Sequence, residues 1–373
     1  MKHKKIWYAL AIIVLIIGAI GVMSFKKNTE TGDIKIGLLA PLTGDVASIG
    51  QGIKSAAELA ISEINQSGGI NGRQIVLIAE DGKCDGKESV TAVTKLVNID
   101  KVSAILGGAC SSESVSTAAI AEDAKVIMFS PLSSSPDLTE AGDYFFRDYP
   151  SDSFQGAKAA DFAVNTLSAK NIAVLSCQSD WCQGVQKVFT ANVRSLGGNI
   201  VAEEKYDDKT SKDLRTQLTK IKSAKPDLVY FLGYTDGTIL GLKQAKEIGL
   251  TAKMLGGDAW NDPKILKSAG EAAEGTMYLM PTAAKNEIFD TAFQKITNGK
   301  EITIGSRETY DAMMILGNIM KKVGSDSSEI KSALYGVKDY QGVSGNISLD
   351  KNGDLISASY DIKIVKNGLV VNY

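Results

Sequence analysis

Beyond residue 33 the chain alternates between short apolar runs and segments with apolar residues at helical spacing, and this alternation limits its possible folds more than any other feature. Ile34–Ala40 is a strand-like run, and Gly50–Ser67 follows it with alanines and isoleucines spaced as on one face of a helix. Strands separated by helices of about 10–15 residues are typical of βαβ units. The pattern therefore predicts an α/β fold with doubly wound parallel sheets, covered by helices on both faces.

The alternation falls into two series, which share a layout but no sequence period. The first predicts strands at Ile34–Ala40, Gln74–Glu80, Val102–Gly107 and Val126–Ser130, and helices at Gly50–Ser67, Lys87–Ile99 and Ser112–Ala124. The second predicts strands at Asn171–Leu175, Asn199–Lys205, Asp227–Leu232 and Lys253–Gly256, and helices at Ser153–Ser168, Gln183–Leu196, Lys212–Ser223 and Gly237–Ile248. Two series predict two lobes.

The end of the chain has a different pattern. After Gly275–Pro281 we expect three further helices, at Ile288–Thr297, Glu308–Lys322 and Ser328–Gly336. Two apolar runs then flank the turn-like segment Asp350–Asp354. Gly345–Leu349 and Ile356–Val365 are therefore predicted to form a hairpin-like β return.

Composition and motifs argue against several classes of function. The chain has 373 residues and a net charge of −2, which gives no electrostatic reason to expect nucleic acid as a partner. Its single histidine, His3, lies in the N-terminal tail, which excludes a Ser–His or Cys–His catalytic pair and a histidine-based zinc site. Dinucleotide-binding, P-loop and nucleophile-elbow motifs are absent from the sequence. We expect a protein that is not an enzyme and needs neither cofactor nor metal.

An apolar segment at the N-terminus predicts export. Ile6–Phe25 contains 20 uncharged, mostly aliphatic residues and follows three lysines. As a helix it would span about 30 Å, the thickness of a bilayer core. A cleaved signal peptide and a retained anchor are both compatible with residues 1–25, and the lack of an A-x-A site favours the anchor. In either case residues 26–33 form a linker, and we expect the rest of the chain outside the cytoplasm. As a retained anchor, residues 6–25 would tether it to the membrane.

Export makes disulfides plausible, and the four cysteines allow three full pairings. Cys84 and Cys110 each follow a predicted strand, so they emerge at the same sheet edge if those strands are neighbours. We therefore expect Cys84 to pair with Cys110, and Cys177 with Cys182. A redox or metal-binding pair at Cys177 and Cys182 is the alternative.

Unusual loops follow the predicted strands at the edge where open α/β sheets bind ligands. In the first series these loops are Ala40–Gly44, Gly107–Ser112 and Ser130–Pro136, and in the second Ser176–Cys182, Gly233–Asp236 and Gly256–Trp260. The first group offers hydroxyls and backbone amides at helix N-termini, which suit a carboxylate. The second group offers aromatic rings and Asp258. Together they describe a site for a zwitterionic α-amino acid.

Structural roles compete with this interpretation. Ser111 or Ser112 could cap the helix that follows, and Ser135, before Pro136, is expected to cap the next one. That leaves Ser133 and Ser134 available for a ligand. Asp262, before Pro263, is an N-cap, so Asp258 is not needed for that role. Tyr234 and Trp181 could be ordinary half-buried aromatics.

The sequence resembles the branched-chain amino-acid-binding proteins of ABC importers, which are type I periplasmic binding proteins. The opening Ile34-Lys-Ile-Gly-Leu-Leu-Ala-Pro-Leu-Thr-Gly44 and the segment Glu63-Ile-Asn-Gln-Ser-Gly-Gly-Ile-Asn-Gly72 carry the resemblance most clearly. It continues through Gly50–Ile53, Gly107–Ser112, Ser130–Leu138, Arg147, Gly233-Tyr234, Gly256–Trp260, Glu274-Gly275, Tyr310-Asp311 and Asp350–Asp354. It implies two lobes joined by three hinge crossings, with lobe 1 at 34–149 and 282–352 and lobe 2 at 150–281 and 353–373.

The resemblance also implies roles for individual residues. Ser111 and Ser134 match the hydroxyls that grip the ligand carboxylate, and the backbone of Leu132 contributes to the same site. Tyr234 matches an aromatic that covers the ligand, and Asp258 matches a glutamate that pairs with its ammonium group. Cys84 and Cys110 match the disulfide of the family.

Three departures from the family pattern concern the second lobe, and the first is that Asp258 is one methylene shorter than the glutamate that it matches. Trp181 stands where the leucine-type proteins have tyrosine, and Cys182 stands where glycine is usual. These departures alter the shape of the pocket. The resemblance implies an aliphatic amino acid as ligand and an ABC permease in the membrane as partner, and we expect a monomer. An anchored amino-acid or amide sensor and an extracytoplasmic enzyme are the alternatives.

Overall fold

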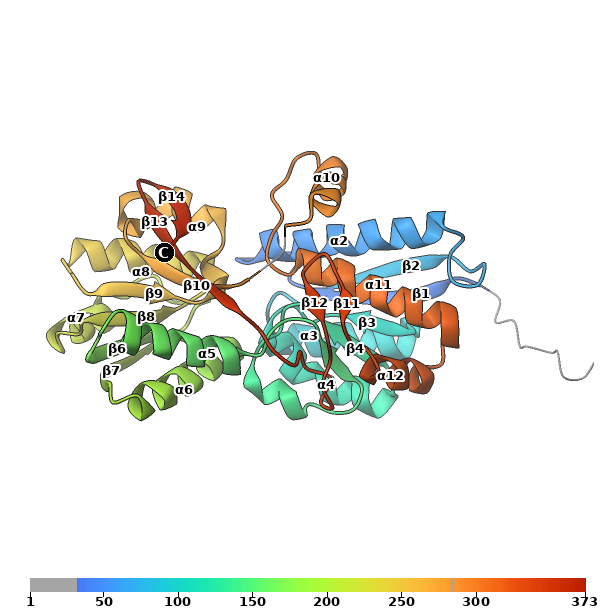
Figure 1. The fold of residues 1–373 in the computed structure, drawn as a ribbon, viewed down its shortest axis with the longest axis horizontal. Helices are drawn as coiled ribbons and strands as arrows, with labels where there is room; N and C mark the ends of the chain where they lie inside the picture. Colours follow the sequence, from blue (N-terminus) through green and yellow to red (C-terminus); the bar gives the residue numbers. More distant parts are fainter. Residues whose placement is uncertain (1–31, 283–284) are drawn as a thin grey trace, which may run out of the picture. The chain divides into compact units, whose positions relative to one another are not determined.

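The computed structural model describes residues 32–282 and 285–373. It has the predicted α/β architecture, built on a five-stranded and a seven-stranded sheet (Figure 1). We call the first sheet with its helices lobe 1 and the second lobe 2. The apolar segment Ile6–Phe25 lies outside the described residues. Within the described ranges, no helix has the combination of length and hydrophobicity that crossing a bilayer requires.

Lobe 1 is a parallel sheet in the order β2-β1-β3-β4-β5. Its strands are β1 (Ile34–Ala40), β2 (Ile75–Asp81), β3 (Ala104–Leu106), β4 (Ile127–Ser130) and β5 (Phe145–Arg147). Its helices are α2 (Ala47–Gln66), α3 (Gly86–Lys95), η1 (Leu96–Asp100), α4 (Ser111–Ala124), η2 (Pro136–Glu140), α10 (Glu287–Ile296), α11 (Ser306–Val323) and α12 (Ser327–Tyr335).

Alternation along β1 places its side chains in two separate cores. Ile36 and Leu38 are buried with residues of α2 and α11, whereas Leu39 is buried with residues of α3 and α4. Figure 1 shows α2 and α11 on one face of this sheet and α3 and α4 on the other. Burial on both faces explains why the strands of lobe 1 are almost continuously apolar.

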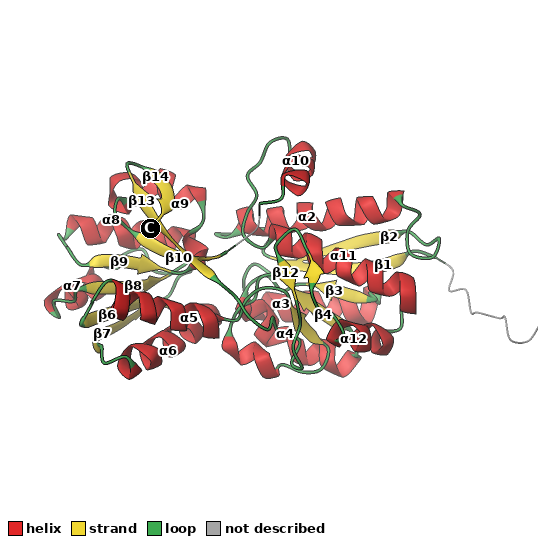
Figure 2. Cartoon of the chain, in the orientation of Figure 1, coloured by secondary structure: helices red, strands yellow, loops and turns green. Residues whose placement is uncertain are grey.

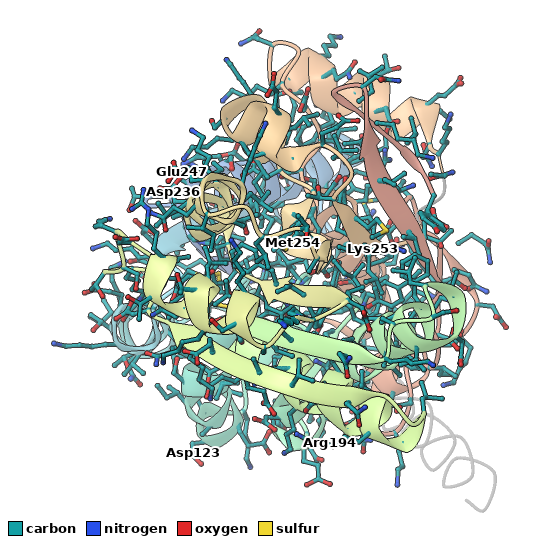
Figure 3. All side chains as sticks on the ribbon, turned by 90° about the vertical axis from the view of Figure 1, so that its left-hand side faces the viewer. Asp123, Arg194, Asp236, Glu247, Lys253 and Met254 are labelled. Atoms are coloured by element: carbon teal, nitrogen blue, oxygen red, sulfur yellow. A yellow bond between two sulfur atoms is a disulfide. The ribbon has the colours of Figure 1, made fainter. Side chains whose placement is uncertain are left out.

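Lobe 2 is a sheet in the order β14-β13-β10-β9-β8-β6-β7. Its parallel strands are β6 (Asn171–Cys177), β7 (Asn199–Tyr206), β8 (Leu228–Leu232), β9 (Lys253–Gly256) and β10 (Met277–Pro281). Its helices are α5 (Asp152–Asp161), η3 (Phe162–Thr166), α6 (Asp180–Ser195), α7 (Arg215–Ser223), α8 (Thr235–Glu247), η4 (Asp258–Trp260), α9 (Pro263–Ala269) and η5 (Gly270–Ala273). Charged side chains such as Arg194, Glu247 and Lys253 lie on its surface (Figure 3).

The chain passes between the lobes three times. It leaves lobe 1 after β5, returns after β10, and leaves again before β13 (Tyr360–Lys366). The two C-terminal strands, β13 and β14 (Leu369–Asn372), then complete the sheet of lobe 2 beside β10 (Figure 2).

The predicted hairpin of Gly345–Leu349 with Ile356–Val365 is present only at its turn, as an antiparallel bridge between Leu349 and Leu355 and a hydrogen bond from the N–H of Ile356 to the carbonyl oxygen of Ser348 at 3.1 Å. Beyond the turn the two runs pair with other strands. The first run contributes β12 (Asn346–Ile347), which pairs with β11 (Tyr340–Gln341), and the second contributes β13, which pairs with β10 and β14. The Asp350 side chain closes the intervening turn on itself, accepting hydrogen bonds from the N–H groups of Asn352 and Asp354 at 2.8 and 3.0 Å. The real hairpin turns at Asn367-Gly368, where both φ angles are positive, at 54° and 71°.

Other elements differ from the sequence prediction mainly at their ends. The strands β5 and β10 were not predicted. Helix α6 begins at Asp180, three residues before the predicted Gln183, because Ser179 caps it by accepting a hydrogen bond from the N–H of Cys182 at 3.2 Å. This earlier start places Trp181 and Cys182 in the first turn of the helix.

Candidate functional site

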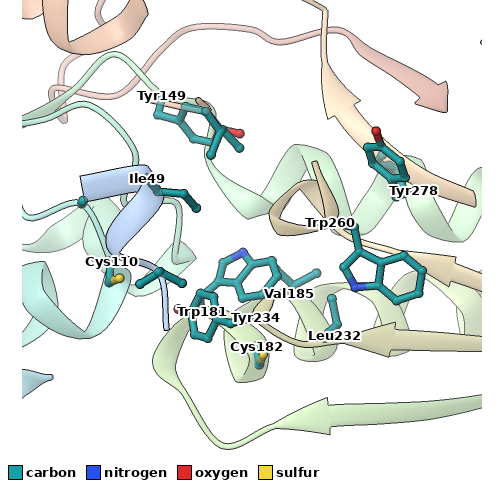
Figure 4. Close-up of a cluster of buried hydrophobic side chains, with 14 of the residues drawn as sticks. Ile49, Cys110, Tyr149, Trp181, Cys182, Val185, Leu232, Tyr234, Trp260 and Tyr278 are labelled. Atoms are coloured by element: carbon teal, nitrogen blue, oxygen red, sulfur yellow. The ribbon is translucent and has the colours of Figure 1, made fainter. Parts of the chain in front are cut away.

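The loops at the carboxyl ends of the strands enclose a cavity between the lobes. All six predicted ligand-binding residues line it, with Ser111, Leu132 and Ser134 from lobe 1 and Trp181, Tyr234 and Asp258 from lobe 2. The remaining lining residues are Pro41, Val46, Ile49, Ala109, Cys110, Ala259 and Ile304. The cavity contains about 450 Å³ of empty space, part of it open to solvent. Figure 4 shows Ile49 and Cys110 on one side and Trp181 and Tyr234 on the other.

On the lobe 1 side, Ser111 joins two loops. It is the first residue of α4, and its Oγ accepts hydrogen bonds from the N–H groups of Ser134 and Ser135 at 3.2 and 3.1 Å. A serine hydroxyl that accepts two hydrogen bonds still has its own proton to donate. Ser111 therefore fixes the neighbouring loop and retains a donor beside the cavity.

Ser133 has a structural role, contrary to the expectation that it would be available for a ligand. Its Oγ donates to the carbonyl oxygens of Gly108 and Cys110, at 2.7 and 2.9 Å, and lies 2.7 Å from the Oγ of Ser114. Ser135 caps η2 as predicted, accepting a hydrogen bond from the N–H of Asp137. Of the three serines, Ser134 alone lines the cavity.

A buried ion pair stabilises the loop Ser130–Pro136, which we call the serine loop. Arg147, fully buried, donates from Nε and Nη2 to the two carboxylate oxygens of Asp354 at 2.6 and 2.8 Å. Its Nη1 donates to the carbonyl oxygen of Ser135 at 2.8 Å. The Arg147–Asp354 pair thus links the third crossing to the serine loop. The family resemblance includes both residues, but no local pattern connects positions 207 apart.

Glu113 holds the loop before α4. Its carboxylate accepts hydrogen bonds from the N–H groups of Ala109, Cys110 and Cys84 at 2.9, 3.0 and 3.0 Å. Burial raises the pKa of Glu113 to about 7, although these three donors act in the opposite direction. The Cys84–Cys110 disulfide, with a Cα–Cα distance of 5.3 Å, ties the same loops together. The predicted pairing is present although β1 lies between the two strands, which are not neighbours.

On the lobe 2 side, aromatic rings form the wall. The rings of Trp181 and Tyr234 lie 5.2 Å apart at an angle of 34°, and both side chains are buried (Figure 4). The predicted Cys177–Cys182 disulfide lies directly beside Trp181. These aromatics are therefore part of the cavity wall and not half-buried surface residues.

Asp258 is a buried carboxylate that lines the cavity from lobe 2. It accepts a hydrogen bond from the hydroxyl of Tyr149 at 2.6 Å and is 3% exposed. Burial raises its pKa, while hydrogen bonding by Tyr149 and Gln155 acts in the opposite direction. Asp262, as predicted, performs the capping role by accepting from the N–H of Lys264 at 2.8 Å.

Sequence reasoning missed a second buried carboxylate, Asp152. Its N–H donates to the carbonyl oxygen of Ser134 at 2.7 Å, and its Oδ1 accepts from Gln155 at 3.1 Å. Its Oδ2 is buried and accepts no hydrogen bond. Burial first, and then the charge of Asp258, raise its pKa well above the usual range. Because Asp152 opens α5, its sequence signal is indistinguishable from that of an acidic residue in a helical first turn.

Comparison with known proteins agrees with this architecture. The profile of the periplasmic binding protein family matches residues 33–368. A leucine-, isoleucine-, valine-, threonine- and alanine-binding protein of Pseudomonas aeruginosa is 31% identical over 347 residues, which cover 92% of each chain. A crystal structure of a leucine-binding protein from Thermotoga maritima is 30% identical with a TM-score of 0.83, covering 91% of this chain and 97% of that one.

A second solved structure contains a ligand. It is a branched-chain amino acid transporter substrate-binding protein of Streptococcus pneumoniae in complex with isoleucine, 29% identical, with a TM-score of 0.82. The match covers 91% of this chain and all of that one. With two lobes, three crossings, a cavity between the lobes and a family match over nearly the whole described region, the chain belongs to the periplasmic binding protein family.

Proposed function

We propose that this chain is the substrate-binding protein of an ABC importer and captures a small aliphatic α-amino acid between its lobes. The observation that carries the proposal is the chemistry of the cavity that Ser111, Ser134 and Asp258 line. Ser111 and Ser134 bring hydroxyls to it, Asp258 brings a buried carboxylate, and aromatic and aliphatic side chains form most of the rest. An α-amino acid presents the complementary groups, a carboxylate, an ammonium group and an apolar side chain.

The ligand carboxylate is proposed to bind at the serine loops of lobe 1. Ser111 and Ser134 supply hydroxyl donors, and the segment around Leu132 supplies backbone groups. Ser111 also stands at the N-terminus of α4, where the aligned peptide dipoles favour an anion. The Arg147–Asp354 ion pair and the Glu113 hydrogen bonds hold these donors in place before any ligand arrives.

The ligand ammonium group is proposed to bind near Asp258 and Asp152. An unpaired charge is costly to bury, so two adjacent buried carboxylates favour either protonation or a cation between them. An ammonium group would satisfy the Oδ2 of Asp152, which accepts no hydrogen bond. A carboxylic acid without an amino group would leave this end of the site unpaired.

The ligand side chain is proposed to contact the apolar part of the wall. Trp181, Tyr234, Ile49 and Ile304 line the cavity, and burying aliphatic surface against them stabilises the complex by about 25 cal/mol per Å². Leucine, isoleucine and valine, named among the ligands of the relatives, are therefore the first candidates.

Capture requires that the lobes move relative to each other. Ligand would stabilise the closed form only through contacts that both lobes make with it, as in other hinge closures. The closed form would then be presented to a membrane permease. Membership of the family places the chain outside the cytoplasm, and tethering by residues 6–25 is part of the proposal. The relatives reported above are binding proteins, which favours capture over the sensing and catalytic alternatives.

A thermal-shift screen of the purified full-length protein tests the proposal. The compounds are the twenty amino acids, urea, short amides, and aromatic and aliphatic carboxylic acids. Binding linkage predicts a stabilisation of about 2.7 kcal/mol at a hundredfold excess over Kd. A shift with leucine, isoleucine or valine supports the proposal. A shift confined to carboxylic acids without an amino group would remove the ammonium role of Asp258 and Asp152.

A further inference from the structure

The Cys177–Cys182 disulfide is placed where it controls one side chain of the cavity wall. Cys177 is the last residue of β6, and Cys182 lies in the first turn of α6, with Trp181 immediately before it. Both sulfurs belong to fully buried residues. The disulfide therefore closes the reversal between strand and helix directly beside the indole.

Further contacts restrict the same reversal. The Oγ of Ser179 accepts a hydrogen bond from the N–H of Cys182 at 3.2 Å and lies 3.1 Å from the sulfur of Cys177. The indole stacks on Tyr234, and a Cβ added to Gly257 would lie only 3.1 Å from the Cζ2 of Trp181. Trp181 is thus held between a fixed backbone, a neighbouring ring and a glycine.

The other disulfide of the cavity is in a different situation. Cys84 and Cys110 are both held by the carboxylate of Glu113 through their N–H groups. The loops that they connect remain fastened by hydrogen bonds if the sulfur bond is removed. The short loop between Cys177 and Cys182 is held differently, by the Ser179 cap, by a hydrogen bond from the N–H of Gln178 to the carbonyl oxygen of Tyr206 at 3.0 Å, and by the disulfide itself.

We propose that the Cys177–Cys182 disulfide is a positioning element that fixes the indole of Trp181 over the cavity before ligand binds. Preorganising a wall residue lowers the entropy lost on binding, and a rigid wall discriminates between ligand side chains more sharply than a mobile one. The inference rests on the proposed function and deepens it, because it assigns side-chain selectivity to a covalent constraint in lobe 2.

The test is a double-mutant cycle measured by isothermal titration calorimetry on the full-length protein. The disulfide is removed as the pair Cys177→Ala and Cys182→Ala, in the wild-type background and with Trp181→Ala. Each variant is titrated with leucine, valine and phenylalanine. We expect removal of the disulfide to weaken binding of the preferred aliphatic ligand about three- to tenfold, the cost of ordering one side chain. The ratio between the affinity for that aliphatic ligand and the affinity for phenylalanine should decrease.

The cycle separates positioning from a general loss of stability. If the disulfide acts through Trp181, its removal has little further effect once the indole is absent. Leu218→Ala, which removes a buried side chain of lobe 2 that does not line the cavity, is the matched control for lost stability, and we expect it to leave the ligand preference unchanged. The pair Cys177→Ser and Cys182→Ser repeats the measurement in case the alanine pair folds poorly.

The proposal would be overturned if removing the disulfide weakened binding as much in the Trp181→Ala background as in the wild-type background. It would also be overturned if removing the disulfide from the wild-type protein changed neither the affinity nor the ligand preference. These outcomes differ from failure of the proposed function, in which the wild-type protein itself binds no amino acid. Melting temperatures recorded in parallel identify any variant whose loss of binding follows from unfolding.

Discussion

The two sides of the cavity are constructed differently. On the lobe 1 side the groups proposed to bind the ligand are hydroxyls and backbone amides, and they are held by buried polar contacts from Glu113, Ser111 and Arg147. On the lobe 2 side the groups are side chains, namely stacked aromatics and carboxylates. The difference indicates that lobe 1 provides a fixed site for the ligand carboxylate. Lobe 2 provides a wall whose shape single substitutions change readily.

This contrast follows from what each side must recognise. Every α-amino acid has the same carboxylate, and backbone amides at a helix N-terminus bind it whatever the side chain is. Ligand side chains differ, and an apolar wall adapts to them through the size and shape of its own residues. Substitutions on the lobe 1 side should therefore change the stability of the fold or lower the affinity for all amino acids equally. Substitutions on the lobe 2 side should change the relative affinities for different amino acids.

The largest expected effect comes from breaking the ion pair under the serine loop. Arg147→Met leaves Asp354 buried without its partner, and removing one member of a buried pair costs about 3–5 kcal/mol of unfolding free energy. Chemical denaturation measures this loss. Arg307→Met, which removes a partly exposed pair with Asp290, is the matched control and should cost less. A loss below about 1 kcal/mol for Arg147→Met would mean that lobe 1 is not held in this way.

Removing the carboxylate of Asp258 should affect binding more than folding. Asp258→Asn keeps the size of the side chain but removes its charge, which leaves the ligand ammonium with Asp152 alone. We expect binding to weaken by about 2 kcal/mol or somewhat more, roughly thirtyfold, in calorimetric titrations with leucine. Asp213→Asn, on the exposed surface, is the control. A loss below about 0.5 kcal/mol would contradict the proposed role of Asp258.

Glu113 makes the stability of lobe 1 dependent on pH. Its pKa is raised from 4.5 to about 7 in the folded protein, so the folded state retains a proton that the unfolded state loses above pH 4.5. The stabilising contribution is fully present below pH 4.5 and is lost as the pH rises to about 7. The loss amounts to about 3 kcal/mol, at 1.4 kcal/mol per unit of pKa shift.

Unfolding measured across this pH range tests the Glu113 prediction. Glu113→Gln lowers stability, because its amide nitrogen faces the N–H of Cys84 or of Ala109 and Cys110 in place of an acceptor. The difference in unfolding free energy between wild type and variant should shrink as the pH rises. Glu301→Gln, on the surface, is the matched control. A constant difference for Glu113→Gln would show that the carboxylate does not titrate in this window.

Local sequence patterns were sufficient for much of this arrangement. The strands β1 and β9 have the predicted bounds, and most helices begin or end within about one turn of the predicted residues. The six residues at the strand tips share one cavity because parallel strands bring their carboxyl ends to the same edge. Periodicity alone does not determine which residues of each loop face the cavity, and the family resemblance supplied that information.

The remaining features depend on contacts between distant residues. Arg147 and Asp354 lie at opposite ends of the fold in sequence, and Asp152 resembles any acidic residue at a helix N-terminus. The final hairpin was misplaced because Asp350–Asp354 has the composition of a hairpin turn, yet Asp354 pairs with Arg147 and the chain continues into lobe 2. Asn367-Gly368, a strong local signal for a type I′ turn, was the better indicator.

The smallest expected effect concerns a contact between the lobes at the rim of the cavity. Lys209 of lobe 2 forms an ion pair with Asp85 of lobe 1, with half of the lysine side chain exposed. Lys209→Met is the useful change, because Asp85 also caps α3 through the N–H groups of Lys87 and Glu88. Exposed pairs contribute about 0–1 kcal/mol and are screened by salt. We expect less than a fivefold change in Kd, which disappears in high salt. A larger change that persists in salt would mean that rim contacts, and not the cavity wall, control closure.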